Sequence, residues 1–397
     1  MDRWLQVKGE TMRNLLPPFL LVASATALSQ SAPPRFTMEW ESLAAHMVRQ
    51  LDLQPGERFV AVAHPGLFDE LIPHLRYEVM RAGAVDLGVI DVLAEPVPAD
   101  WSEDVLIQGA ERARAALADV LGDVDASVML PGTSPSHPAY AAIQDLLRSG
   151  HGRTVHFHWL QGGSAIPLPG QPLPPRHAIE ATYQHALLEA DYESLAAHQQ
   201  RFVQAMRSGE VRVTNPAGTD IRFRIADRPV NIQNGDASAD RADRGVVLVD
   251  REIELPAGAV RVAPLEQSVS GTVAFPPSQW SGRAVTGLKL EFEAGIVTAI
   301  SAESGLDAVT AEMDAAGAAG RAFREFALGF NPLLAVPENS PWIPYYGYGA
   351  GVVRLSLGDN SELGGAVGGG YVRWNFFTDT TVTIDGQEWV RDGRLAR

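Results

Sequence analysis

Three histidines lie close together before residue 160, and imidazole is a common metal ligand. His156 and His158 alternate along an expected strand, so both rings face one side of it, and His151 lies just before them. These residues are candidates for a metal clamp. No carboxylate is near them in the sequence, and the strand is expected inside a sheet, so we favour a structural role in the core.

A hydroxyl nucleophile is the second kind of chemistry to consider, in the segment PGTSPSHP. Ser134, Ser136 and His137 there combine hydroxyl groups with an imidazole. Nothing resembling the GxSxG nucleophile elbow surrounds them. We therefore favour a turn followed by a helix cap, which these residue types also suit.

Four aromatic residues gather in the segment SPWIPYYGYG. Trp342, Tyr345, Tyr346 and Tyr348 have large rings with a polar tip. Such residues often line ligand or subunit contacts, and they equally suit a loop packed over the core. The sequence leaves both interpretations open.

Composition limits the possible partners. The chain has 397 residues, 32 Lys plus Arg and 48 Asp plus Glu, giving a formal net charge of -16. Such a surface repels phosphate backbones and anionic membranes, so no nucleic-acid partner is expected. The chain has no cysteine, which excludes disulfides, thiolate metal sites and a cysteine nucleophile.

Residues 1–35 are predicted to be a signal peptide and leader. A short basic start, Met12–Asn14, precedes the apolar run Leu15–Val22, and Ala25–Ala27 offers the small residues of a cleavage site. The apolar run is too short to span a bilayer, so no membrane span is expected. We predict export to the periplasm or the outside; the alternative is a disordered tail from a misassigned start.

The rest of the chain is predicted to form two domains. In residues 36–208, short apolar strands alternate with helical segments, which indicates an α/β domain with a doubly wound parallel sheet. In residues 209–397, alternating strands joined by short turns predominate, which predicts a strand-rich α+β domain.

Four segments of the chain carry a family resemblance: LDLQPGERFVAVA, LPAGAVRVAPLEQSVSG, GRAFREFALGFNP and AGVVRLSLGDN with the following YVRW. Together they resemble the aminopeptidase T family, which includes the aminopeptidase S and aminopeptidase II type metallopeptidases. The third segment resembles the GE-x-x-LGxN segment of the family, and the fourth resembles GxxHIALGxx followed by HxD.

The resemblance implies an N-terminal α/β domain, a strand-rich C-terminal domain that carries the site, and a homodimer. Family members hold two divalent metal ions on two Glu, two His and one Asp, with an assisting Tyr. The ions polarise the scissile carbonyl and generate hydroxide.

This sequence departs from that metal-binding set at nearly every position. The second Glu is retained as Glu325, whereas an Arg replaces one His and another replaces the Asp. No His follows His198, so the predicted second domain has no imidazole ligand. The aligned positions are Ala259, Glu325, Arg354, Ser361, Tyr371 and Arg373.

We therefore predict an exported aminopeptidase-T-like protein that has lost the dinuclear metal site, needs no cofactor and binds peptides or small carboxylates. Glu325, Arg354, Arg373 and Tyr371 are the candidate ligand-binding residues, and no catalytic residue is assigned. A remnant salt bridge is the other explanation of these arginines. The alternative function is an active aminopeptidase or other hydrolase with relocated ligands.

Overall fold

The computed structural model describes residues 36–93, 97–134, 136–160, 163–245 and 247–396. Residues 36–397 form one compact unit, and the predicted signal peptide and leader lie outside the described residues. In the described ranges, no helix is both long enough and apolar enough to cross a membrane.

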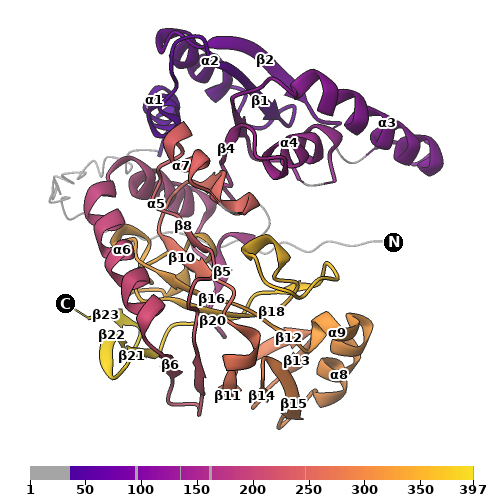
Figure 1. Cartoon of the computed structure of the whole chain (residues 1–397). Coiled ribbons are helices and arrows are strands. Elements are labelled where there is room, and N and C mark those ends of the chain that lie inside the picture. The colour runs from indigo at the N-terminus through magenta and orange to yellow at the C-terminus, as the bar shows by residue number, and fades with distance from the viewer. Residues whose placement is uncertain (1–35, 94–96, 135, 161–162, 246, 397) are drawn as a thin grey trace, which may run out of the picture. The chain divides into compact units, whose positions relative to one another are not determined.

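Five parallel strands form the first sheet, in the order β2-β1-β3-β4-β9 (Figure 1). The parallel sheet predicted for residues 36–208 is confirmed, and β9 adds a strand from beyond residue 208. The proposed domain boundary itself stays a prediction. The strands are β1 (Arg58–Ala63), β2 (Val85–Asp91), β3 (Ala126–Met129), β4 (Arg153–His156) and β9 (Glu252–Glu254).

Helices connect these strands and lead into the rest of the chain. The Oγ of Ser102 accepts a hydrogen bond from the backbone N–H of Val105, at 3.4 Å, and so caps α3. The helices are α1 (Trp40–Leu51), α2 (Leu71–Arg81), α3 (Glu103–Leu121), α4 (Pro138–Arg148), α5 (Arg176–Leu188), α6 (Tyr192–Ser208), α7 (Ala239–Asp243), α8 (Leu306–Ala315) and α9 (Gly317–Gly320).

The remaining strands form antiparallel sheets, which confirms the strand-rich second half. A central sheet has the order β19-β18-β16-β10-β8, with β20 also paired to β18. Its strands are β8 (Val230–Ile232), β10 (Ala259–Val262), β16 (Phe323–Gly329), β18 (Val353–Gly358), β19 (Val372–Arg373) and β20 (Phe376–Phe377).

A larger sheet and two two-stranded sheets complete the fold. The larger sheet has the order β15-β14-β11-β7-β6-β21-β22-β23, and the pairs are β12-β13 and β17-β5. The bounds are β5 (Ile166–Pro167), β6 (Val211–Thr214), β7 (Asp220–Phe223), β11 (Ser270–Ala274), β12 (Ser278–Trp280), β13 (Arg283–Val285), β14 (Lys289–Glu293), β15 (Ile296–Ser301), β17 (Trp342–Ile343), β21 (Thr381–Ile384), β22 (Gln387–Arg391) and β23 (Arg394–Leu395).

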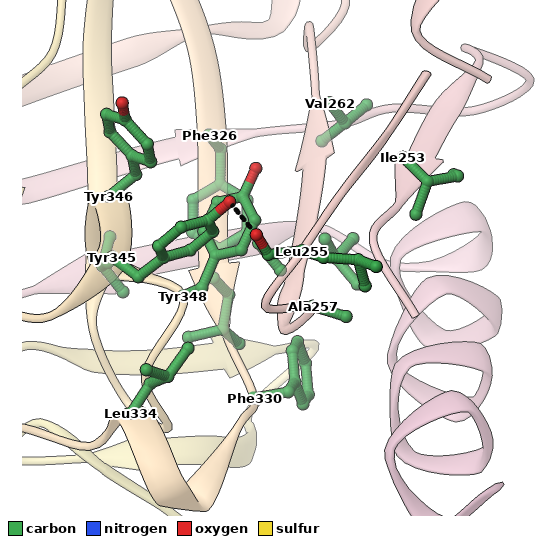
Figure 2. Packing of buried hydrophobic residues seen from close by; sticks show 14 of the residues in the cluster. Ile253, Leu255, Ala257, Val262, Phe326, Phe330, Leu334, Tyr345, Tyr346 and Tyr348 are labelled. Carbon is green, nitrogen blue, oxygen red and sulfur yellow. Dashed lines mark hydrogen bonds between the residues drawn. The ribbon is translucent and has the colours of Figure 1, made fainter. Parts of the chain in front are cut away.

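The main core lies against one face of the central sheet. The ring of Phe326 on β16 packs against Phe202 of α6 and Phe223 of β7. Nearby, the hydroxyl of Tyr345 donates a hydrogen bond to the backbone oxygen of Leu255 at 2.6 Å (Figure 2). The four aromatic residues of SPWIPYYGYG are at most 8% exposed, so the packed-loop interpretation accounts for them.

Candidate functional site

Strand register places two arginines in one row on the other face of the central sheet. Ala327 on β16 pairs with Arg261 of β10 on one side and with Arg354 of β18 on the other. The small methyl group of Ala327 leaves room between the two long side chains. Glu325 lies two residues earlier on the same strand, and side chains alternate along a strand, so its carboxylate shares their face.

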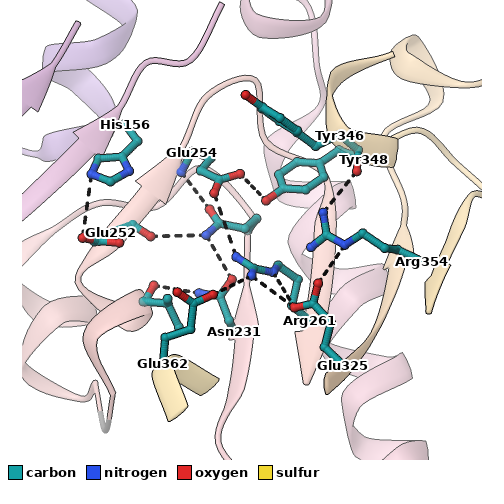
Figure 3. Close-up of polar contacts among 12 residues, drawn as sticks. His156, Asn231, Glu252, Glu254, Arg261, Glu325, Tyr346, Tyr348, Arg354 and Glu362 are labelled. Atoms are coloured by element: carbon teal, nitrogen blue, oxygen red, sulfur yellow. Dashed lines mark hydrogen bonds and ion pairs between the residues drawn. The ribbon is translucent and has the colours of Figure 1, made fainter. Parts of the chain in front are cut away.

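Glu325 is the centre of the resulting ion cluster (Figure 3). Its Oε1 lies 2.8 Å from Nε of Arg354, and its Oε2 lies 3.1 Å from Nη2 of Arg261. The hydroxyl of Ser356 donates a further hydrogen bond to Oε1 at 3.2 Å. The salt bridge considered as the other explanation of the arginines is therefore present between Glu325 and Arg354.

A third arginine reaches the cluster because the strand pairing is irregular. The register between β16 and β18 shifts between Phe323 and Glu325, and an extra residue of this kind can redirect a side chain. That residue is Arg324, which pairs with Glu362 and has its Nε 3.9 Å from Oε2 of Glu325. Glu362 also lies 3.1 Å from Nη2 of Arg261.

These charges keep a fully buried carboxylate ionised. Glu325 is 0% exposed, and burial alone would raise its pKa. The positive charges of Arg261, Arg354 and Arg324 outweigh that effect and hold the pKa of Glu325 well below its usual range.

A divalent ion does not fit this site. Three guanidinium groups, Arg261, Arg324 and Arg354, face three carboxylates, Glu254, Glu325 and Glu362. An added ion would leave two uncompensated positive charges in a buried environment. Arginine is always protonated and cannot coordinate a cation. The part of the chain that the structure describes contains no group of three or more His, Cys, Asp or Glu able to hold a metal.

The other two candidate residues contact a different carboxylate. Nη1 of Arg373 lies 2.7 Å from Oε1 of Glu312, and the hydroxyl of Tyr371 donates to the same oxygen at 2.9 Å. Arg373 also stacks on Trp280, with its Cζ 3.5 Å from the ring centroid. The structure thus brings Glu325 and Arg354 together, and Arg373 and Tyr371 together, in two separate ion clusters.

Replacing Arg373 with methionine is expected to lower the free energy of unfolding by about 1–3 kcal/mol. Burial alone would raise the pKa of Glu312, and Arg373 helps to keep it low, so the variant leaves a half-buried charge without its partner. Urea denaturation measures the change. The control is Arg283→Met, since Arg283 pairs with Asp307 in solvent and an exposed pair contributes little. Unchanged stability of Arg373→Met would contradict a structural role for Arg373.

The buried network continues toward the carboxyl ends of the parallel strands. Glu254, at the end of β9, accepts a hydrogen bond from Tyr348, and its Oε1 lies 3.9 Å from Nη1 of Arg261. Glu252 lies 3.7 Å from Nε2 of His156. Burial raises the pKa of Glu252 to about 8 and lowers the pKa of His156 to about 4. At neutral pH a protonated carboxyl therefore faces a neutral imidazole.

The remaining sequence candidates have local structural roles. Ser134 donates its backbone N–H to Nδ1 of His137 at 3.1 Å, and its Oγ lies 2.7 Å from that of Ser136. His137 is the N-cap residue of α4, as expected for a turn that enters a helix. The ring of His158 lies 5.2 Å from that of His156, and burial lowers the pKa of His158 to about 4.

Several residues of the network were missed in the sequence. Arg261 follows Ala259 by two positions, so strand alternation alone would have placed it on the same face as a former metal ligand position. Glu254 and Glu362 gave no comparable signal, because they reach the site through pairing and loop packing rather than through sequence spacing.

Comparisons with known proteins show likenesses in sequence and in fold. The sequence profile of a family described as thermophilic metalloprotease (M29) matches residues 188–333. Wild-type AmpT from Thermus thermophilus has a TM-score of 0.63 at 18% identity, covering 90% of this chain and 99% of AmpT. The 2,5-dihydroxypyridine dioxygenase from Pseudomonas putida KT2440 has a TM-score of 0.59 at 14% identity, covering 90% of this chain and 96% of the dioxygenase. No curated protein matches the sequence.

The sequence profile and the fold together support an aminopeptidase-like protein. The resemblance to the thermophilic metalloaminopeptidase family is confirmed, through the sequence profile over residues 188–333 and through the fold over most of the chain.

Proposed function

We propose that this aminopeptidase-like protein binds peptides or small carboxylates and has no metallopeptidase chemistry at the family's metal position. The observation that supports this most is the ion pair between Arg354 and Glu325. The family resemblance aligns Arg354 with an imidazole ligand. A guanidinium group recognises carboxylates through paired hydrogen bonds but cannot act as a Lewis acid or generate hydroxide.

Arg354 also has hydrogen-bonding capacity to spare. Its side chain is 3% exposed, and its Nη1 donates to the backbone oxygen of Tyr346 at 3.3 Å. Among the described residues, its Nη2 has no hydrogen-bond partner although it is buried. A buried donor without an acceptor is costly, so a ligand oxygen at Nη2 would be strongly favoured.

Replacing Arg354 with methionine should weaken the binding of a dipeptide by about 1.5–3 kcal/mol, the contribution of a hydrogen bond to a charged group. Calorimetric titration against a dipeptide library measures the change. The matched control is Arg153→Met, because Arg153 is about as buried as Arg354. It lies at the N-terminal end of β4, where it pairs with Glu57 at 2.7 Å. The control should lose stability and keep its affinity.

Two results would contradict the proposal. The first is a wild-type protein that binds no dipeptide or small carboxylate. The second is an Arg354→Met variant with unchanged affinity. Arg373 and Tyr371 stay candidates in the same assay, and loss of binding in Arg373→Met without loss of stability would assign Arg373 to the ligand rather than to Glu312.

The alternative is an active aminopeptidase or other hydrolase with relocated ligands. It draws on the imidazole of His156 beside Glu252, at the carboxyl ends of adjacent parallel strands, where α/β proteins often bind ligands. Stoichiometric zinc, cobalt or manganese retained after dialysis, with turnover of an aminoacyl-p-nitroanilide, would support this alternative against the binding function.

We also propose that the protein is exported and forms a homodimer. Export rests on the basic start, apolar run and small residues within positions 12–27, and predicts a mature chain that begins near Leu28. N-terminal sequencing of exported protein tests it, and retention of Leu15–Val22 in soluble cytoplasmic protein would contradict it. The dimer rests on the family resemblance, and light scattering that gives a strict monomer would contradict it.

A further inference from the structure

A groove with a volume of ≈560 Å³ lies beside the segment that joins β19 to β20. Its walls come from distant parts of the chain and are mainly apolar; they include Ile166, Phe275, Ile343, Phe376 and Phe377. Its volume is in the range of small-ligand sites, which are typically apolar with a few polar groups that fix orientation.

Trp374 both lines this groove and contacts Arg354. The indole lines the groove, and its ring centroid lies 4.9 Å from Cζ of Arg354. Trp374 also makes an edge contact with Tyr346, with ring centroids 5.5 Å apart. Trp374 is 40% exposed, so neighbouring residues cover only part of its side chain. An exposed side chain of this kind changes rotamer easily, whereas the buried Arg354 does not.

We propose that the groove holds the apolar side chain of a short peptide whose terminal carboxylate binds Nη2 of Arg354 once the indole of Trp374 has turned aside. The inference rests on the proposed carboxylate binding at Arg354 and adds the class of side chain that the ligand carries.

The chemistry of the two sides of Trp374 is complementary to such a ligand. Moving the indole costs the cation–π contact with Arg354, and the carboxylate replaces it with a charge-assisted hydrogen bond, which is the stronger interaction. An apolar side chain removes water from the apolar walls, which a glycine residue cannot do.

Three ligands separate the two parts of this inference. Gly-Leu carries both the carboxylate and an apolar side chain, Gly-Leu-amide lacks the carboxylate, and Gly-Gly lacks the side chain. Calorimetric titration of the full chain should show Gly-Leu binding at least about tenfold more tightly than Gly-Gly, since burial of a leucine side chain gives at least that factor. Gly-Leu-amide should bind at least about tenfold more weakly than Gly-Leu, because it has no carboxylate to pair with Arg354.

Variants then assign each effect to its residue. Ile166→Asn places a neutral polar group in the groove and should lower the affinity for Gly-Leu about tenfold while leaving Gly-Gly unchanged. Ile107→Asn, on the exposed surface of α3, is the control and should change neither affinity.

Equal affinities for Gly-Leu and Gly-Gly, both weakened in Arg354→Met, would overturn the groove assignment and leave the proposed function standing. Equal affinities for Gly-Leu and its amide would overturn carboxylate binding at Arg354, and the inference with it.

Discussion

Replacing Glu325 with glutamine is expected to lower the free energy of unfolding by about 3–5 kcal/mol, the cost of removing one partner from a buried ion pair. Glu325 is 0% exposed and faces Arg261, Arg324 and Arg354, which are each at most 5% exposed. Without its charge, three guanidinium groups remain with only Glu254 and Glu362 as counter-charges. Urea denaturation at neutral pH measures the loss.

A double variant distinguishes charge imbalance from lost packing. Glu325→Gln combined with Arg354→Met removes one charge of each sign, so it should be more stable than Glu325→Gln alone. The surface control is Glu388→Gln, because Glu388 pairs with Arg391 where both side chains are exposed and such pairs contribute little. If Glu325→Gln unfolds within about 0.5 kcal/mol of the wild type, which is the scale of a surface substitution, the cluster does not stabilise the fold as described.

The regular strands of the site could be predicted from sequence, because alternation and motif order determine which side chains share a face. The resemblance aligns Glu325 and Arg354 with ligands of one site, and the structure brings the two residues together. Strand alternation would also have placed Arg261 on their face. The motifs indicate which strands lie side by side, because each of the motifs that carry Ala259, Glu325 and Arg354 spans a complete strand of the central sheet.

The irregular segments could not be predicted in the same way. Arg324 reaches the cluster only through the register shift next to Glu325, which no spacing rule signals. Arg373 pairs with Leu357 at the far end of β18, whereas Arg354 pairs with Phe376, and this offset separates the two arginines. Glu312, the partner of Arg373, comes from α8, and only the tertiary fold brings that helix to β19.

The ionisation of buried groups in this protein also predicts a maximum of stability near pH 6.5. Burial lowers the pKa of His46, His156 and His158 from 6.5 to about 4. Between pH 4 and pH 6.5 the unfolded chain binds protons at these histidines and the folded protein does not. The free energy of unfolding therefore falls as pH drops from 6.5 to 4. Glu252 has the opposite effect, because its pKa is about 8 in the folded protein and 4.5 in the unfolded chain. The stability that its bound proton contributes is therefore lost as pH rises from 4.5 through 8. Below pH 6.5 the destabilising effect of the three histidines on the folded protein is larger than the stabilising effect of Glu252.

Replacing Glu252 with glutamine should therefore remove the decline on the alkaline side and leave the acid side in place. A difference of one bound proton changes the free energy of unfolding by about 1.4 kcal/mol per pH unit, so Glu252 alone should lower the stability of the wild type by about 1.6 kcal/mol between pH 6.5 and 8. The three histidines offset about 1 kcal/mol of this loss, because the unfolded chain gives up its remaining imidazole protons over the same range. The Glu252→Gln variant should therefore gain about 1.6 kcal/mol relative to the wild type between pH 6.5 and 8. Glutamine keeps a neutral group beside His156 and can still contact Gln144, the present hydrogen-bond donor to Glu252 at 3.2 Å. Urea denaturation of both proteins between pH 4.5 and 8.5 gives the two curves. Wild-type and Glu252→Gln curves that run parallel from pH 6.5 to 8 would show that Glu252 is ionised in the folded protein at neutral pH.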